Sequence, residues 1–259
     1  MATAFVSQQQ NQLLMSLPAS SRRRVLGELQ EVDLPFGFRM AVAGEPVECV
    51  YFLNSGIASV LLPTADNGFS TTGIIGNDGF APFPLIDRGT DCPVSVEVLV
   101  PGAGYVMEAG SFVRLLRNDR FIEKLFMGFV RILLLQTAST VSSVIHQKIE
   151  KRLARWLLMC HDRLVGNDIT LTHDSLAHIL GVRRASVTTA LHVLEGKGFL
   201  RSTRGLITLK DRPGLEHYVG RSYGLAERAY RSLIAGGSDH DHSPQSVGEV
   251  FGGAFTNLQ

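Results

Sequence analysis

One stretch restricts the possible folds more than any other part of the sequence: LTHDSLAHILGVRRASVTTALHVLEGKGFLRSTRGLITL, from Leu171 to Leu209. Its first part has the apolar spacing of a short helix, which Thr172 can cap and Gly181 can end in a left-handed conformation. A second helix begins within about three residues and turns Val187 inward. The small residue Ala177, the glycine four positions later and the branched residue six positions further on indicate a helix-turn-helix.

A hairpin follows the second helix. The runs FLRST and LITL alternate around Arg204 and Gly205, which predicts a two-stranded wing. Between Thr170 and Pro213 there are seven basic and three acidic residues, whereas the whole chain of 259 residues has a formal net charge of +1. Positive charge is therefore concentrated at the helix-turn-helix, as expected of a surface that meets a phosphate backbone.

The second helix leaves several polar side chains off its apolar face. An arginine fork can donate two hydrogen bonds to guanine in the major groove, and hydroxyl groups suit phosphate oxygens. We expect Arg184 to read bases, and Arg183, Ser186 and Arg204 to contact the backbone. The predicted DNA-binding residues are Arg183, Arg184, Ser186, Thr188, Thr189, His192 and Arg204. A winged helix that makes only protein contacts is the alternative.

The remaining pattern is of two kinds. From about residue 32 to residue 108, short apolar or alternating runs separated by glycines predict a small antiparallel barrel or roll. A long helical pattern then runs from about Phe121 to Arg163, and its apolar spacing of four and three predicts a seam between two parallel helices. A helix that packs on its own domain is the alternative. The predicted dimer-interface residues are Val130, Leu134, Thr137, Val141 and Val144.

With these motifs in place, the sequence resembles the Crp/Fnr family of bacterial transcription regulators. The resemblance is carried by the stretch quoted above, by KIEKRLARWLLM before it and by VECVYFLNSGIASVL nearer the N-terminus. It implies an α+β fold with an N-terminal cyclic-nucleotide-binding-like β-roll, a long dimerisation helix and a C-terminal winged helix-turn-helix. The expected division is residues 1–118 for the N-terminal helices and sensor-like β-roll, 119–163 for the dimerisation helix, 164–235 for the DNA-binding domain and 236–259 for a disordered tail.

The resemblance also implies a function. A homodimer would regulate transcription by binding double-stranded DNA at a palindromic operator, with half-sites about one helical turn apart, and would contact RNA polymerase. Many members begin the recognition helix with Arg-Glu-Thr-Val, where this chain has Arg184-Ala185-Ser186-Val187. Ala185 lacks the carboxylate that accepts from cytosine, and Thr189 stands where another base-reading arginine can occur. We therefore expect a different operator sequence.

The effector motif of the family is incomplete. Members that bind cyclic nucleotides carry Gly-Glu-Leu and a later Arg-Ser or Arg-Ala pair. Here Gly79-Phe80-Ala81 lacks the glutamate, Val94-Ser95 lacks the arginine, and Arg88 lies about six residues early. Because a buried phosphate without a cation is costly, we expect a β-roll that is degenerate for cyclic nucleotides, and we predict no cofactor.

Other functional classes find little support. The three cysteines, Cys49, Cys92 and Cys160, lie far apart and form no CxxC pair, which argues against a disulfide framework, a zinc ribbon or an iron–sulfur cluster. Haem ligation by a cysteine, His146 or His161 has no supporting motif. The sequence holds no G-x-S-x-G, H-E-x-x-H or phosphate-binding glycine loop, so we predict neither an enzyme nor a metal site.

The N-terminal residues MATAFVSQQQNQ lack the layout of a signal peptide, and the most apolar run, FMGFVRILLLQTA, is interrupted by Arg131 and too short to span a bilayer. We therefore expect a cytoplasmic protein without a membrane partner. The alternative function is a small-molecule or protein-binding signalling module without a DNA function. The operator sequence, the effector and the choice between activation and repression remain open.

Overall fold

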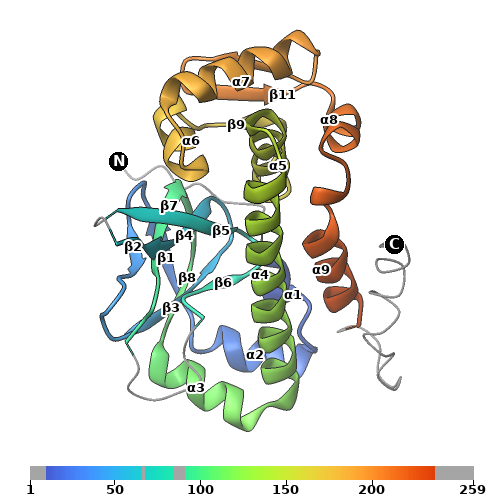
Figure 1. Cartoon of the computed structure of the whole chain (residues 1–259). Coiled ribbons are helices and arrows are strands. Elements are labelled where there is room, and N and C mark those ends of the chain that lie inside the picture. The colour runs from blue at the N-terminus through green and yellow to red at the C-terminus, as the bar shows by residue number, and fades with distance from the viewer. Residues whose placement is uncertain (1–9, 66–67, 84–90, 237–259) are drawn as a thin grey trace, which may run out of the picture.

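A computed structural model describes residues 10–65, 68–83 and 91–236. It shows the predicted α+β fold, with a β-roll at one end of a long helix and a winged helix at the other (Figure 1). Arg88 and nearly all of the predicted tail, residues 236–259, lie outside the described residues.

Two four-stranded antiparallel sheets form the β-roll. Their strand orders are β1-β8-β3-β6 and β2-β7-β4-β5. The turn from β3 to β4 passes so close to another strand end that a Cβ on Gly56 would lie 2.6 Å from the carbonyl oxygen of Val100, so only glycine fits there. The strands are β1 Gln30–Leu34, β2 Arg39–Ala41, β3 Cys49–Leu53, β4 Ile57–Pro63, β5 Phe69–Ile75, β6 Phe80–Ala81, β7 Ser95–Val100 and β8 Gly102–Glu108.

Helices cover the β-roll on the side of its aromatic core. α1 (Gln12–Met15) and α2 (Ala19–Leu26) precede the sheets, and α3 (Ala109–Asn118) and α4 (Arg120–His146) follow them. Asp119 begins α4, because its carboxylate accepts a hydrogen bond from the backbone N–H of Phe121 at 2.9 Å. The buried face of α4 carries apolar side chains that join the β-roll in one hydrophobic cluster: Ile122, Leu125, Phe126, Phe129 and Leu133.

The predicted single helix from Phe121 to Arg163 is wrong in one respect, because it is divided into α4 and α5 (Ile149–His161). Gln147 and Lys148 between them are extended. The Gln147 side chain donates to the Ser222 hydroxyl at 2.7 Å, and its Oε1 accepts from the Ser143 hydroxyl at 2.7 Å. These polar contacts end α4, whereas neither proline nor glycine marks the break in the sequence.

α4 is longer than the apolar run noted in the sequence. By length and composition alone it passes a test for a membrane-spanning helix, with a mean hydropathy of 1.4. One face of the helix packs against the β-roll. The buried side chain of Gln136 accepts from the backbone N–H of Ile74 at 2.7 Å and donates to the carbonyl of the same residue, which fastens α4 to β5.

A second hydrophobic cluster holds the winged helix together. It surrounds Trp156 and Leu157 of α5 and also takes in Ile57 and Ile74 from the β-roll. The elements after α5 are β9 (Asp168–Ile169), α6 (His173–Leu180), α7 (Arg184–Gly196), β10 (Leu200–Thr203), β11 (Leu206–Leu209) and α8 (Arg212–Val219).

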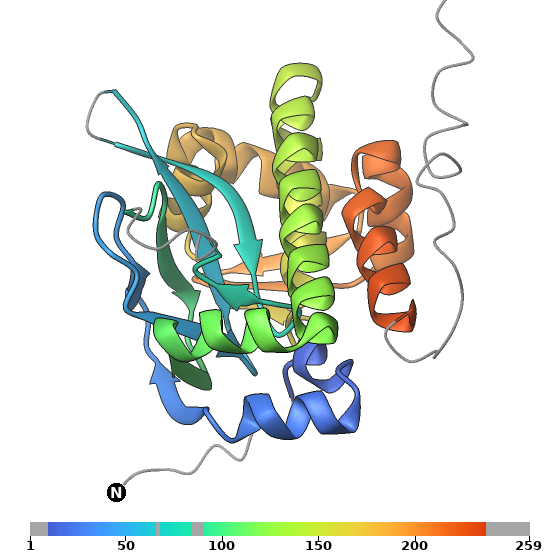
Figure 2. The same ribbon diagram turned by 90° about the horizontal axis from the view of Figure 1, so that it is seen from below.

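The last helix, α9 (Leu225–Gly236), returns from the winged helix and lies beside α4 (Figures 1 and 2). Tyr230, Leu233 and Ile234 join the hydrophobic cluster of the β-roll. The close approach needs a small residue on α4, since a Cβ on Gly128 would lie 2.5 Å from the Leu233 side chain. The chain therefore fastens the winged helix back onto the β-roll end.

Candidate nucleic-acid interface

The predicted helix-turn-helix is formed by α6 and α7. Thr172 caps α6, because its hydroxyl oxygen accepts from the backbone N–H of Ser175 at 3.0 Å. Gly181 ends α6 at φ 63° and ψ 42°, a left-handed conformation that glycine adopts at little cost. Val187, on the inner face of α7, is completely buried. Local sequence chemistry thus sets the direction in which α7 leaves α6.

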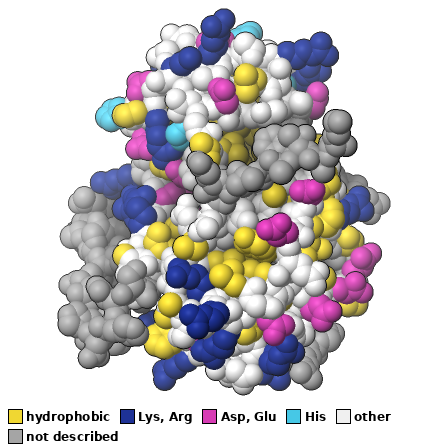
Figure 3. Space-filling view, turned by 180° about the vertical axis from the view of Figure 1, so that it is seen from behind, with side chains coloured by type: hydrophobic (Ala, Val, Ile, Leu, Met, Phe, Trp, Pro, Cys, Tyr) yellow, Lys and Arg dark blue, Asp and Glu magenta, His cyan; other side chains and the backbone are white. Residues whose placement is uncertain are grey.

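The beginning of α7 is open to solvent. The side chain of Arg184 is 67% exposed, and Arg183 at the N-cap is exposed as well. No side chain caps α7, so its first backbone N–H groups and the positive end of its dipole are suited to an anionic oxygen. Figure 3 shows Lys and Arg side chains around this outer end of the molecule.

The hydroxyl groups of α7 are already engaged within the protein. Thr189 is exposed and donates to the carbonyl oxygen of Ala185 at 3.1 Å, while Thr188 donates to that of Arg184 at 3.3 Å. Ser186 is half-buried, and His192 is exposed one turn beyond Thr188. The helix thus brings the predicted residues together, but its threonine hydroxyls carry less free donor capacity than the sequence alone suggests.

Two contacts from the first turn of α6 reach the exposed side of α7. The carboxylate of Asp174 lies 3.5 Å from Nε of Arg184, and Nδ1 of His173 lies 3.0 Å from the hydroxyl of Thr188. Neither contact was predicted from the sequence. Spacing could not reveal them, because they depend on the angle between the two helices.

The wing is formed as predicted by β10 and β11. Thr203 pairs with Leu206 across the turn, and Gly205 adopts φ 74°. Arg204 is exposed at this tip. The backbone N–H of Ser202 donates to the Glu195 carboxylate at 3.2 Å, so the wing is held against α7.

Two basic residues of the predicted patch have partners within the protein. Arg212 pairs with Asp162 at 2.6 Å and with Glu216 at 2.8 Å, and its Nη2 donates a hydrogen bond to the Tyr223 hydroxyl at 2.8 Å. The ammonium group of Lys197 lies 5.4 Å from the centre of the Tyr218 ring. The cations left for an outside partner are therefore fewer than the seven counted in the sequence.

Comparisons with known proteins agree with this geometry. The family described as a Crp-like helix-turn-helix domain matches residues 151–218. The structure of FixK2 from Bradyrhizobium japonicum superposes with a TM-score of 0.63 at 18% identity, covering 73% of this chain and 96% of that one. A protein from Eubacterium rectale described as a transcriptional regulator of the Crp/Fnr family gives 0.61 at 16% identity, covering 80% and 97%. No curated protein sequence matches the chain.

The chain therefore carries a Crp-like helix-turn-helix domain, within a fold that Crp/Fnr-family transcription regulators share. A Crp/Fnr regulator from Thermus thermophilus also shares the fold, with a TM-score of 0.60 at 20% identity over 73% of this chain and 98% of that one. At such low identities the structural likeness establishes the fold, while the family match locates the DNA-binding domain. The neighbours from Eubacterium rectale and Thermus thermophilus are described as transcriptional regulators.

In the N-terminal part of this protein, phenylalanines fill the region next to the incomplete effector motif. Phe80 is completely buried, and its ring centroid lies 5.1–5.3 Å from those of Phe112, Phe126 and Phe129. Gly79 is covered so closely that a Cβ there would lie 2.0 Å from the Phe129 ring. The hydroxyl of Ser95 is likewise occupied, accepting from the backbone N–H of Ala43 at 3.0 Å. Aromatic packing thus takes up the space around Gly79-Phe80-Ala81.

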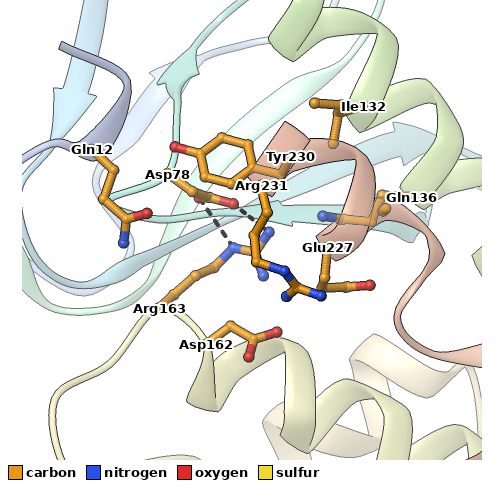
Figure 4. A pocket seen from close by; sticks show the side chains of 10 residues that line it. Gln12, Asp78, Ile132, Gln136, Asp162, Arg163, Glu227, Tyr230 and Arg231 are labelled. Carbon is orange, nitrogen blue, oxygen red and sulfur yellow. Dashed lines mark hydrogen bonds and ion pairs between the residues drawn. The ribbon is translucent and has the colours of Figure 1, made fainter. Parts of the chain in front are cut away.

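A cavity of about 170 Å³ lies where the β-roll, α4, the end of α5 and α9 meet (Figure 4). Arg163 is buried there and forms a bidentate ion pair with Asp78, at 2.5 Å and 3.2 Å. Burial alone lowers the pKa of this guanidinium, but the carboxylates of Asp78, Asp162 and Glu227 outweigh it, so the pKa is raised. The cavity is smaller than the roughly 300 Å³ or more of typical ligand pockets.

The three cysteines are free thiols. Burial raises the pKa of Cys160 to about 12, and burial is also the first cause of the raised pKa values of Cys49 and Cys92. All three are therefore poor nucleophiles at neutral pH. Of the described residues, no three His, Cys, Asp or Glu side chains come together in a way that suits a metal ion.

Proposed function

We propose that this regulator acts as a cytoplasmic homodimer that recognises a palindromic DNA operator through α7 of each subunit. The observation that carries the proposal is the exposed guanidinium of Arg184 at the uncapped start of α7. In a Crp-like helix-turn-helix this position enters the major groove. Arg184 reads a guanine, while Arg183, Ser186 and Arg204 contact phosphates. RNA polymerase is the further partner that the resemblance implies.

The homodimer is supported by the surface of α4. Three of the five predicted interface residues are largely exposed: Leu134 at 70%, Val141 at 54% and Val144 at 51%. Val130 packs partly against the β-roll cluster, and Thr137 donates its hydroxyl to the carbonyl of Leu133. Exposed apolar residues at helical spacing on an otherwise core-packed helix are expected where a second copy of the helix covers them.

We further propose that the β-roll binds no cyclic nucleotide. The fully buried Phe80 occupies the place of the motif's glutamate, and a phosphate near Ser95 would find no cation on its own strand, β7. The domain then acts as a scaffold or senses a ligand of another kind. The alternative function is a small-molecule or protein-binding module that does not bind DNA. Among the described residues, no feature favours this alternative over a DNA-binding regulator. A catalytic role is not part of the proposal.

The proposal is tested by selecting bound duplexes from a random pool with the full chain, followed by gel shifts on the selected sequence and a scrambled one. We expect a two-fold symmetric site with half-sites about 10 base pairs apart, and an affinity that falls steeply with salt. A pool that shows no enrichment, or equal affinity for both duplexes at every salt concentration, contradicts the proposed function.

A further inference from the structure

The contact between Asp174 and Arg184 places an acid on the surface proposed to face DNA. Both side chains are largely exposed, at 69% and 67%. An exposed ion pair contributes little to stability, and the helix dipole adds a modest stabilisation of an acid in the first turn of α6. A negative charge beside phosphates also weakens attraction to any duplex.

The geometry of the pair leaves the reading edge of the arginine free. Asp174 meets Arg184 at Nε, at 3.5 Å from Oδ1. The guanidinium has five N–H donors, and the four on Nη1 and Nη2 remain for another acceptor. Those terminal nitrogens can supply the two parallel hydrogen bonds that guanine O6 and N7 accept in the major groove.

A second contact between α6 and α7 lies next to this ion pair. Nδ1 of His173 and the hydroxyl of Thr188 lie 3.0 Å apart, and Thr188 follows Arg184 by one helical turn. Neighbouring residues in the first turn of α6 therefore touch α7 at two successive turns of the same side. The distance between Asp174 and Arg184 is thereby tied to the rigid packing of the two helices.

We propose that Asp174 is a positioning residue that determines specificity: its carboxylate attracts the Nε edge of Arg184, so that the terminal guanidinium nitrogens face a guanine of the operator. This inference rests on the proposed function. The carboxylate orders the arginine for the correct base, and this raises specificity because specificity is a difference of affinities. Its repulsion of phosphates weakens binding to every duplex alike, so it lowers affinity without changing that difference.

The test compares the operator with a scrambled duplex, using the full chain at fixed salt. For Asp174→Ala we expect tighter binding to the scrambled duplex and a ratio of the two dissociation constants that falls by about three- to tenfold, part of what one bidentate contact supplies. Asp174→Asn keeps a side-chain oxygen beside Nε but loses the charge, so it should bind both duplexes more tightly while its ratio stays within about twofold of wild type.

Two further comparisons separate positioning from a general effect. In an Arg184→Ala background, adding Asp174→Ala should leave the ratio unchanged, because the residue it positions is gone. Asp168→Ala removes an acid of the same domain whose carboxylate accepts from Thr208 instead, and it should not lower the ratio. Equal thermal unfolding of the variants excludes a folding defect.

The inference is overturned if Asp174→Ala shifts both dissociation constants by the same factor, or lowers the ratio equally with and without Arg184. These results differ from a failure of the proposed function, in which the wild-type protein itself does not distinguish the operator from the scrambled duplex. In that case both proposals fall together.

Discussion

Arg163 and Asp78 join the end of α5 to the loop after β5 through a buried ion pair with an Nη2–Oδ2 distance of 2.5 Å. Arg163 also donates to the carbonyl oxygen of Met159 at 2.8 Å, and Asp78 accepts from the backbone N–H of Gly76 at 2.8 Å. A Cβ on Gly76 would lie 2.7 Å from the Arg163 side chain. The pair thus connects the loop that leads to Phe80 with the winged helix.

Removing one partner of this pair should be costly. We expect Asp78→Ala to lower the free energy of unfolding by about 3–5 kcal/mol, because it leaves a buried guanidinium without its carboxylate. Urea unfolding measures the change. The double variant Asp78→Ala with Arg163→Met should recover most of the loss, and no recovery would show that the pair is not the source of the cost.

Removing the arginine that is proposed to read bases should weaken binding to the operator more than binding to scrambled DNA. We expect Arg184→Ala to weaken binding to the selected operator by about 1–3 kcal/mol and to change binding to scrambled DNA much less. Arg183→Ala is the matched control at the neighbouring position, and it should weaken both duplexes alike because a phosphate contact carries no sequence information. Fluorescence anisotropy with labelled duplexes measures both; equal losses for Arg184→Ala would rule out base reading.

A single charged residue in the proposed dimer interface on α4 should disrupt the dimer. We expect Leu134→Glu to convert the dimer into monomers in analytical ultracentrifugation, because it places carboxylates in an apolar helix–helix contact. Val165 is also exposed, at 75%, but lies outside α4, so Val165→Glu should leave the dimer intact. A Leu134→Glu protein that still sediments as a dimer would locate the interface elsewhere.

The aromatic core of the β-roll should be structural. We expect Phe80→Ala to lower the free energy of unfolding by about 3–5 kcal/mol, the usual cost of emptying a buried phenylalanine site. Phe69, which is 45% exposed, serves as the control, and Phe69→Ala should cost no more than about 0.5 kcal/mol. Added cyclic AMP should not change the melting temperature of the wild-type protein, whereas a rise of several degrees would contradict a degenerate β-roll.

The helix-turn-helix glycine should resist substitution. We expect Gly181→Ala to cost about 1–2 kcal/mol, because φ 63° brings a Cβ too close to the backbone even though no other group lies within 4 Å. Gly196 ends α7 and also has open space around it, without a left-handed φ. Gly196→Ala should therefore be neutral or slightly stabilising in thermal unfolding, and equal losses at both positions would remove the backbone explanation.

The sequence predicts best where structure follows from neighbouring residues. Thr172, Gly181 and Val187 act through capping, a left-handed turn and burial within one short segment, so their roles could be predicted from their spacing. The division of α4 from α5 could not, because Gln147 ends α4 through a hydrogen bond to Ser222, far along the chain. The Asp78–Arg163 pair depends in the same way on residues that are distant in sequence.

The site was predicted in part for the same reason. The exposed arginines of α7 follow from helical periodicity, which places them opposite the apolar face. Their internal partners do not, since the contacts of Asp174 and His173 depend on how two helices cross. Counting charges could not show, either, that Arg212 forms ion pairs with Asp162 and Glu216 and is therefore less available to DNA.

The return of α9 along α4 has a consequence for how the molecule comes apart. Tyr230, Leu233 and Ile234 belong to the same hydrophobic cluster as Phe126, although nearly the whole winged helix separates them in the chain. The N-terminal half can therefore complete its interior only after the C-terminal residues have been synthesised. Cooperative melting of both ends in a single transition, and late completion of folding on the ribosome, are what this topology entails.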